Sequence, residues 1–260
     1  MPDAPLVRLD VTAGRATVTL DSPANRNALS RRLLAELVDA LQAAAAEESV
    51  RVVVLTGSGT VFCSGADLKE AREGGTVGVS GLPEILRLIM EGNRPVVARV
   101  NGAARAGGVG LLAACDVAVA PLSASFAFSE VRIGVAPAVI AVPCLRRMPR
   151  QAARRLMLTG RTFGAAEAVE AGLIDVAAPE DGLDAAVDEV VAALLLGAPE
   201  ALAYTRRLVD AMTGSDPNSL SRDLDRMLEL SAERFGSYEA AEGIRAFLER
   251  RPPSWVPPAD

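Results

Sequence analysis

The stretch Val61–Glu70, VFCSGADLKE, follows a strand-like apolar run at Val52–Thr56, VVVLT. A short continuous apolar run is typical of a strand buried in a parallel sheet, and Gly57-Ser58-Gly59 ends this one. Small residues, Ser64-Gly65-Ala66, then lead to a helix start at Asp67. A loop of this kind presents free N–H donors that can hold a developing negative charge, although taken alone it is more typical of an ordinary turn.

Composition limits the possible classes of protein. The chain has 260 residues, 50% of them hydrophobic and 23% charged, which suits one large domain or a domain with a small appendage. Its net charge of −6 argues against broad binding to nucleic acid or to anionic membranes. The absence of histidine excludes Ser-His and Cys-His nucleophiles and the usual zinc and non-haem iron sites. Acid–base chemistry must therefore use a carboxylate, Lys, Tyr or Cys.

The cysteines and the N-terminus predict a soluble, cytoplasmic protein. Cys63, Cys115 and Cys144 form no CxxC pair and no disulfide framework, which fits a reducing compartment. The first ten residues lack the basic and apolar regions of a signal peptide. Residues 106–128 approach the length of a membrane span, but glycines, Asp116 and a proline divide them into a buried helix and a strand.

Strands and helices are expected to alternate in the first half of the chain, which would then become mainly helical. Residues 6–11 and 16–20 are expected to form a hairpin, and Ser30 to cap a helix. Further strands are expected at 96–100, 117–120, 125–127 and 173–176, and a mobile segment at 73–81. Helices are expected at 82–91, 107–115, 151–158, 165–171, 183–196, 200–212, 221–234 and 238–250, with no clear fixed-period repeat.

Asn101–Gly110 repeats the design of the first loop: a strand, a tight turn, small residues and a helix start. Gly107-Gly108 would expose N–H groups at the N-terminus of the following helix, where the helix dipole favours an anion. Two such loops can each aim one N–H at a single oxygen, which is the geometry of an oxyanion hole. Nucleotide motifs do not fit, because Phe62 stands where a third glycine belongs and no Lys-Ser/Thr follows Gly107.

Further motifs follow in order along the chain: Asn25–Leu29 (NRNAL), Phe62–Glu70, Val100-Asn101-Gly102 with Gly107-Gly108, Cys115-Asp116, Phe128–Gly134 (FSEVRIG), Leu158-Thr159-Gly160, Glu170–Ile174 and Glu242–Leu248. Together they resemble the enoyl-CoA hydratase/isomerase (crotonase) superfamily over nearly the whole chain. The resemblance is highly specific for the superfamily and much less specific for the reaction.

The resemblance implies an α/β fold: a crotonase-like spiral of ββα turns over residues 1–195, a C-terminal helical trimerisation region at 196–250, and a loosely held tail at 251–260. It implies a homotrimer or a hexamer built from two trimers. The substrate would be an acyl-CoA thioester, with no cofactor because the coenzyme A belongs to the substrate. Its carbonyl would lie between the N–H groups of Ser64 and Gly107, which stabilise an enolate.

The resemblance also implies a set of residues along the substrate. The adenine end would lie along Ala66, Asp67 and Leu68, and Phe247 and Arg250 would reach the site from a neighbouring subunit. The remaining members of the predicted substrate-binding set are Arg26, Ala28, Phe62, Ser64, Gly107, Gly110, Glu130 and Pro137. Val139 and Ile140 are expected either to wall the acyl pocket or to pack in the core, and Arg105 either to meet a substrate anion or to face solvent.

Hydratases of the family hold a water between two glutamates, and only one is present here. Glu130 matches the second, and its apolar neighbours favour a raised pKa. The first falls on Gly110, where we expect room for a bulky acyl chain, and Asp116 is expected to have a structural role. We favour a hydratase that adds water to a 2-enoyl-CoA. The alternatives are a single-glutamate enoyl-CoA isomerase and an acyl-CoA-binding paralogue without activity.

Overall fold

A six-stranded sheet forms the centre of the computed structural model, which describes residues 4–72, 78–212 and 219–256. Its strands are β1 (Val7–Thr12), β2 (Arg15–Leu20), β3 (Val52–Gly57), β5 (Val96–Arg99), β7 (Val117–Pro121) and β10 (Val176–Ala178), in that spatial order. The strands from β2 to β10 are parallel, and β1 joins the edge as the antiparallel partner of β2. The predicted hairpin is therefore confirmed.

A second, smaller sheet determines where the site forms. It contains β4 (Val61–Cys63), β6 (Ala103–Arg105), β8 (Ser125–Ala127) and β9 (Phe163–Gly164). In the chain, β3 is followed by β4, β5 by β6, and β7 by β8, so each of these three strands of the first sheet has a short successor in the second. A helix then returns the chain to the next long strand. The chain thus makes three successive ββα turns, a structural repeat that the irregular spacing of the sequence hides.

Helices surround the two sheets. They are α1 (Arg31–Ala46), α2 (Leu68–Arg72), α3 (Leu82–Glu91), α4 (Gly107–Ala114), α5 (Ala138–Arg147), α6 (Arg150–Thr159), α7 (Ala165–Glu170), α8 (Leu183–Leu196), α9 (Pro199–Met212), α10 (Ser219–Phe235) and α11 (Tyr238–Glu249). Four short 3-10 helices complete the described part: η1 (Pro23–Asn25), η2 (Gly78–Gly81), η3 (Ser129–Ile133) and η4 (Glu180–Gly182). None of the helices in the described part combines the length and apolar character needed to cross a membrane.

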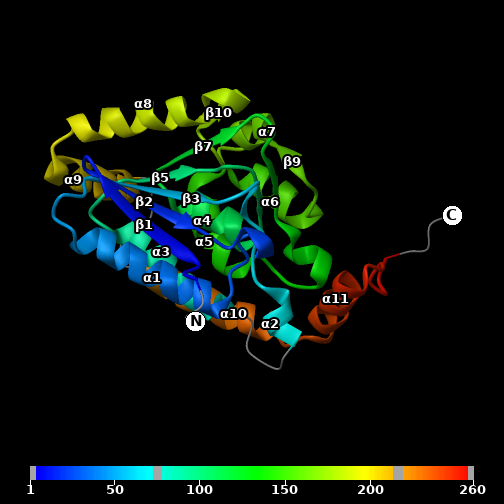
Figure 1. The fold of residues 1–260 in the computed structure, drawn as a ribbon. Helices are drawn as coiled ribbons and strands as arrows, with labels where there is room; N and C mark the ends of the chain where they lie inside the picture. Colours follow the sequence, from blue (N-terminus) through cyan, green and yellow to red (C-terminus); the bar gives the residue numbers. More distant parts are fainter. Residues whose placement is uncertain (1–3, 73–77, 213–218, 257–260) are drawn as a thin grey trace.

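The central sheet is buried on both faces, as continuous apolar strands predict. Val53 and Leu55 of β3 face the main core together with α1 and α3, whereas Val52 and Val54 face α8. Figure 1 shows α8 along one side of the sheet and α1 on the other. Burial of both faces holds the strand ends in fixed positions, which the site requires.

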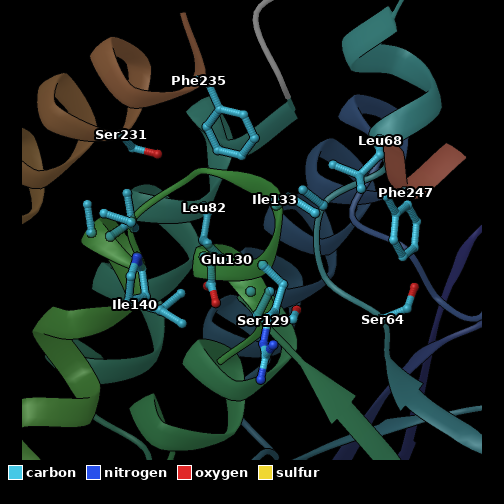
Figure 2. Close-up of a pocket in the computed structure, with 18 residues that line it drawn as sticks. Ser64, Leu68, Leu82, Ser129, Glu130, Ile133, Ile140, Ser231, Phe235 and Phe247 are labelled. Atoms are coloured by element: carbon cyan, nitrogen blue, oxygen red, sulfur yellow. The ribbon is translucent and has the colours of Figure 1, made fainter. Parts of the chain in front are cut away.

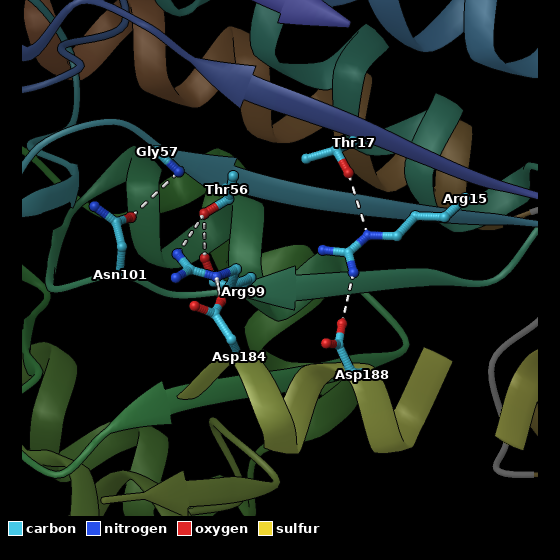
Figure 3. A network of polar contacts seen from close by, with 8 residues as sticks. All are labelled: Arg15, Thr17, Thr56, Gly57, Arg99, Asn101, Asp184 and Asp188. Atoms are coloured by element: carbon cyan, nitrogen blue, oxygen red, sulfur yellow. Dashed lines mark hydrogen bonds and ion pairs between the residues drawn. The ribbon is translucent and has the colours of Figure 1, made fainter. Parts of the chain in front are cut away.

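Two ion pairs attach α8 to the sheet (Figure 3). Arg15 of β2 contacts Asp188 at 2.7 Å, and Arg99 of β5 contacts Asp184 at 2.6 Å. The Thr56 hydroxyl also donates a hydrogen bond to the backbone carbonyl of Arg99 at 2.8 Å. Both aspartates are largely exposed, so these pairs orient the helix more than they stabilise it.

The structure corrects several predicted elements. Helix α5 was not expected, because Pro143 and several β-branched residues weaken its helical signal. The strand expected at 173–176 lies instead at Val176–Ala178, and Leu173 is buried in the turn before it. Part of the expected mobile segment at 73–81 falls outside the described residues, and residues 78–81 form η2. The other predicted helices agree with the structure to within two residues at each end.

The first part of the C-terminal tail is held in place, contrary to expectation. Arg251 donates to both carboxylate oxygens of Glu242, at 2.7 and 3.0 Å, and the Ser254 N–H donates to the same carboxylate at 3.0 Å. The hydrogen bonds from Arg251 hold the pKa of Glu242 down, at about 2. The tail therefore folds back onto α11 as far as these contacts extend.

Candidate active site

The site forms where three neighbouring parallel strands end. Within the small sheet β6 lies between β4 and β8, with Cys63 opposite Ala104 and Ala104 opposite Phe126. Because parallel strands end at the same edge of a sheet, the residues that follow them are brought together. The three successive turns thus contribute, in order, the loop at Ser64, the start of α4 at Gly107, and η3 with Glu130.

These residues line one cavity of about 150 Å³, shown in Figure 2. Ser64, Leu68 and Phe247 lie on one side of this view, whereas Ile140 and Ser231 lie on the other, with Phe235, Leu82 and Glu130 between them. The described lining residues are mostly apolar: Ser64, Ala66, Leu68, Leu82, Ala106, Gly107, Ser129, Glu130, Arg132, Ile133, Ala136, Pro137, Ala138, Val139, Ile140, Ser231, Phe235 and Phe247. An apolar cavity with few polar groups is typical of a small-molecule site.

The two predicted glycine loops pack directly against each other. Gly65 has φ +87°, and a Cβ added to it would lie 2.9 Å from the Cβ of Ala106 and 3.5 Å from the Gly107 nitrogen. Ala106 itself has φ +47°, a left-handed conformation that is uncommon for a residue with a side chain. Close approach and backbone strain at one place indicate that this junction is held in a specific geometry.

The two amides predicted to form the oxyanion hole differ in their partners. Gly107 is the first residue of α4, so its N–H has no acceptor within the helix, and no residue in the described ranges accepts from it. The Ser64 N–H, in contrast, donates to the Arg26 carbonyl at 3.1 Å. Gly107 therefore presents an N–H that is free among the described residues, whereas the Ser64 amide already has one acceptor.

Glu130 carries the acidic group of the cavity. Its side chain is 8% exposed, and its Oε2 atom is buried without a hydrogen-bond partner among the described residues. Burial raises the pKa of Glu130 to about 7, against a small opposing effect of a hydrogen bond with its own backbone. The group is therefore poised to take up or release a proton near neutral pH.

The position of the missing glutamate is closed. A Cβ added to Gly110 would lie 2.4 Å from Cγ2 and 2.8 Å from Cβ of Ile140, which projects from α5. Gly110 does not contribute to the cavity lining, although Ile140 and Val139 do. The expectation that Gly110 leaves room for a bulky acyl chain is therefore wrong, because the Ile140 side chain fills that room.

Comparison with known proteins identifies this arrangement. The sequence model of the enoyl-CoA hydratase/isomerase family matches residues 10–257. The chain belongs to this family. A crystal structure of an enoyl-CoA hydratase from Mycobacterium avium matches with a TM-score of 0.85 at 42% identity, covering 98% of this chain and 100% of that one. The predicted crotonase-like α/β fold is thereby confirmed.

Two sequence relatives come from a bacterium and a mammal. The 2,3-dehydroadipyl-CoA hydratase of Escherichia coli (strain K12) is 32% identical, over 92% of this chain and 93% of its own length. The mitochondrial enoyl-CoA hydratase domain-containing protein 3 of Rattus norvegicus is 32% identical, over 93% of this chain and 81% of its own. Family membership supports the prediction of an enzyme with hydratase-like activity on an acyl-CoA.

The structure brings together only part of the predicted substrate-binding set of this family member. Ser64, Ala66, Leu68, Gly107, Glu130, Pro137 and Phe247 line the cavity, whereas Arg26, Ala28, Phe62, Asp67, Gly110 and Arg250 do not. Phe62 is fully buried in the core and Ala28 nearly so, because both pack behind the site. Phe247 lines the cavity of its own chain.

Polar residues near the site have structural partners. Asp67 accepts from the Lys69 N–H at 3.0 Å and from the Asn25 side chain at 2.7 Å, so it caps α2. Asp116 accepts from the Val96 N–H at 2.7 Å, which confirms its predicted structural role.

Arg105 and Cys63 also belong to the scaffold and not to the chemistry. Arg105 is half-buried, donates to the carbonyl of Ser125 at 2.5 Å and to its hydroxyl at 2.9 Å, and does not line the cavity. Burial raises the pKa of the Cys63 thiol to about 12, which keeps it protonated near neutral pH, a state in which a thiol is a poor nucleophile.

Sequence reasoning missed the cavity residues from α3 and α10: Leu82, Ser231 and Phe235. One signal was available on α10. Its buried stripe runs through Leu220 and Leu224 to Ser231, and a serine interrupts an otherwise apolar face. A polar residue at such a position indicates a contact other than core packing.

Proposed function

We propose that the protein adds water across the 2,3 double bond of an enoyl-CoA thioester, with Glu130 as the only acid–base carboxyl. The buried, unpartnered Oε2 of Glu130 carries this proposal, since it lies in the same cavity as Ser64 and Gly107. A carboxylate with one unpartnered oxygen and a pKa near 7 has the properties of a general base.

The proposed reaction balances with one carboxyl group. The ionised Glu130 takes a proton from a water molecule as the water oxygen bonds to C3, and the double-bond electrons move toward the thioester oxygen. The Gly107 N–H stabilises the enolate oxygen, and the Ser64 N–H contributes through a bond shared with the Arg26 carbonyl. The carboxyl then returns its proton to C2. The net change is the addition of one water.

A second candidate is the shift of a double bond from C3–C4 to C2–C3, and the closed Gly110 position favours it. With Ile140 in place of a second carboxylate, one group must both remove and return protons. A single glutamate that moves a proton from C2 to C4 would isomerise a 3-enoyl-CoA to a 2-enoyl-CoA through a dienolate whose oxygen lies at the same amides. Both reactions use the same residues, so only their products separate them.

The test is incubation with crotonyl-CoA and 3-hexenoyl-CoA in deuterated water, with products read by mass spectrometry. A deuterated 3-hydroxyacyl-CoA from crotonyl-CoA supports the hydratase. A 2-enoyl product from 3-hexenoyl-CoA, without hydration of either substrate, supports the isomerase. Binding without turnover of either would leave the acyl-CoA-binding paralogue. The Glu130→Gln variant serves as the inactive control.

We further propose that the protein assembles as a trimer or as two stacked trimers in the cytoplasm and that it uses no cofactor besides the substrate's coenzyme A. Support for assembly comes from α9, whose side chains of Leu208 and Met212 are 60% and 77% exposed. Apolar side chains exposed on one helix are typical of a protein interface. Light scattering coupled to size-exclusion chromatography would measure the mass directly.

A further inference from the structure

Ser231 is the polar residue at the acyl end of the cavity. Its side chain projects from α10, is 4% exposed, and points toward the cavity in Figure 2. Figure 2 places it with Ile140 on the side away from Ser64, Leu68 and Phe247. If the thioester lies at Ser64 and Gly107, the acyl chain extends toward Ser231.

The Ser231 hydroxyl has no partner within the described residues. Hydroxyls on helices often donate to the carbonyl one turn back, as Thr159 and Thr205 do here at 2.8 and 2.7 Å. Ser231 makes no such bond, and no other described group donates to it or accepts from it. The cavity reaches this hydroxyl, so its hydrogen-bond partner is whatever fills the cavity, either water or a bound ligand.

The surroundings of Ser231 determine which partner fits. Ile140, Leu82 and Phe235 are apolar, so an alkyl chain would displace water and leave the hydroxyl unsatisfied, which is unfavourable. A carboxylate would lose its hydration without gaining a cation. Arg132 is the only cation among the described lining residues, and it is exposed and donates to the Thr159 carbonyl at 2.9 Å.

We propose that Ser231 hydrogen-bonds an uncharged oxygen, a hydroxyl or a ketone, carried by the acyl chain beyond the reacting double bond. The enzyme therefore prefers oxygen-bearing enoyl-CoA substrates to plain alkyl ones of the same length. This inference rests on the proposed function in one respect, the placement of the acyl chain in this cavity. It adds the type of acyl chain, which the proposed reaction does not specify.

The test measures binding of saturated analogues, which cannot be hydrated or isomerised. Hexanoyl-CoA is compared by calorimetry with hexanoyl-CoA bearing a hydroxyl at C4, C5 or C6, against wild type, Ser231→Ala and Ser221→Ala. Ser221 lies on the same helix and accepts from Arg87 at 3.2 Å, so it is the matched control. We expect wild type and Ser221→Ala to bind one hydroxylated analogue about fivefold to tenfold more tightly than hexanoyl-CoA. Ser231→Ala should lose that preference while its affinity for hexanoyl-CoA is kept or raised.

Two results would overturn the inference: equal affinity of wild type for all analogues, or a preference that survives in Ser231→Ala. Because binding is measured without chemistry, a protein that isomerises instead of hydrating would still show the preference. A protein that hydrates crotonyl-CoA but lacks the preference refutes only the role of Ser231. Failure to bind any acyl-CoA refutes both proposals.

Discussion

Glu130 and Gly110, the two positions at which the family resemblance implies a carboxylate, are built in opposite ways. At Glu130 a carboxyl is buried with one oxygen unpartnered and a pKa raised to about 7. At Gly110 no side chain is present, and Ile140 packs so closely that even a methyl group would clash. Glu130 thus has a buried oxygen that lacks a hydrogen bond within the described part of the chain, which lowers stability, whereas Gly110 is part of an ordinary contact between two helices.

The contrast separates a position suited to chemistry from one suited to packing. A buried carboxyl with an unpartnered oxygen lowers stability, which is typical of a group with a functional role. A close helix contact through glycine raises packing density and requires no catalytic role. We therefore expect changes at Glu130 to alter catalysis with little loss of stability, and changes at Gly110 to do the reverse.

The largest effect is expected from Glu130→Gln. The amide keeps the shape of the side chain but cannot exchange a proton, so turnover should fall at least ~100-fold. Calorimetry should show that affinity for a saturated acyl-CoA is retained, because the cavity is unchanged. Turnover that stays within a few-fold of wild type would remove Glu130 from the mechanism and end the contrast between the two positions.

The next effect is on stability, from Gly110→Ala. An alanine normally stabilises a helix relative to glycine, but this one would lie 2.4 Å from Ile140 Cγ2, so we expect the free energy of unfolding to fall by about 1–3 kcal/mol. Denaturant unfolding measures it. Shortening the neighbour in Gly110→Ala/Ile140→Val should recover part of the loss.

Gly164→Ala is the matched control for that variant, because no atom lies within 4 Å of an added Cβ there and no comparable loss is expected. A Gly110→Ala protein as stable as wild type would show that the contact between α4 and α5 can relax.

The third effect is a pH dependence of catalysis. The base must be ionised, and the pKa of Glu130 is raised to about 7, so kcat/KM should fall about tenfold for each pH unit below that value and level off above it. Initial rates with crotonyl-CoA between pH 5 and 9 give the profile. A rate that stays constant down to a normal glutamate pKa would mean that the carboxyl is solvated during the reaction.

The smallest effect is a pH-dependent difference in stability. The pKa of Glu130 is about 7 in the folded protein, above its ordinary value of 4.5, so the folded state binds this proton more tightly than the unfolded state does. The resulting contribution to the free energy of unfolding is complete below about pH 4.5 and is lost as the pH rises through 7. Glu130→Gln does not ionise. Its unfolding free energy relative to wild type should therefore be higher at pH 8 than at pH 4, by on the order of 1 kcal/mol or more. An identical difference at both values would contradict the burial of an ionised carboxyl.

The sequence allowed prediction of the parts of the site that local motifs encode. The loops at Ser64 and Gly107 and the carboxylate of Glu130 each follow a recognisable strand, and parallel strands bring such ends together. The hydrogen bond from Ser64 to the Arg26 carbonyl joins residues far apart in the chain, so no local pattern indicated it.

The Gly110 position could not be predicted for the same reason. Its outcome depends on α5, whose helical signal is weakened by Pro143, and on the way Ile140 meets α4. Ser231 needed the tertiary position of α10 as well as its apolar stripe. Local sequence thus predicted the chemical groups of the site, and helix packing determined the shape around them.

The close contact between Ile140 and Gly110 also predicts which pairs of residues can occupy these two positions in related proteins. A glutamate arriving at the α4 position needs the volume that the isoleucine now takes, so the two sites are expected to co-vary. Homologous chains with an acid there should carry glycine or alanine on α5, and those with a large aliphatic residue on α5 should keep glycine. An alignment in which the two sites vary independently would show that this pair imposes no evolutionary constraint.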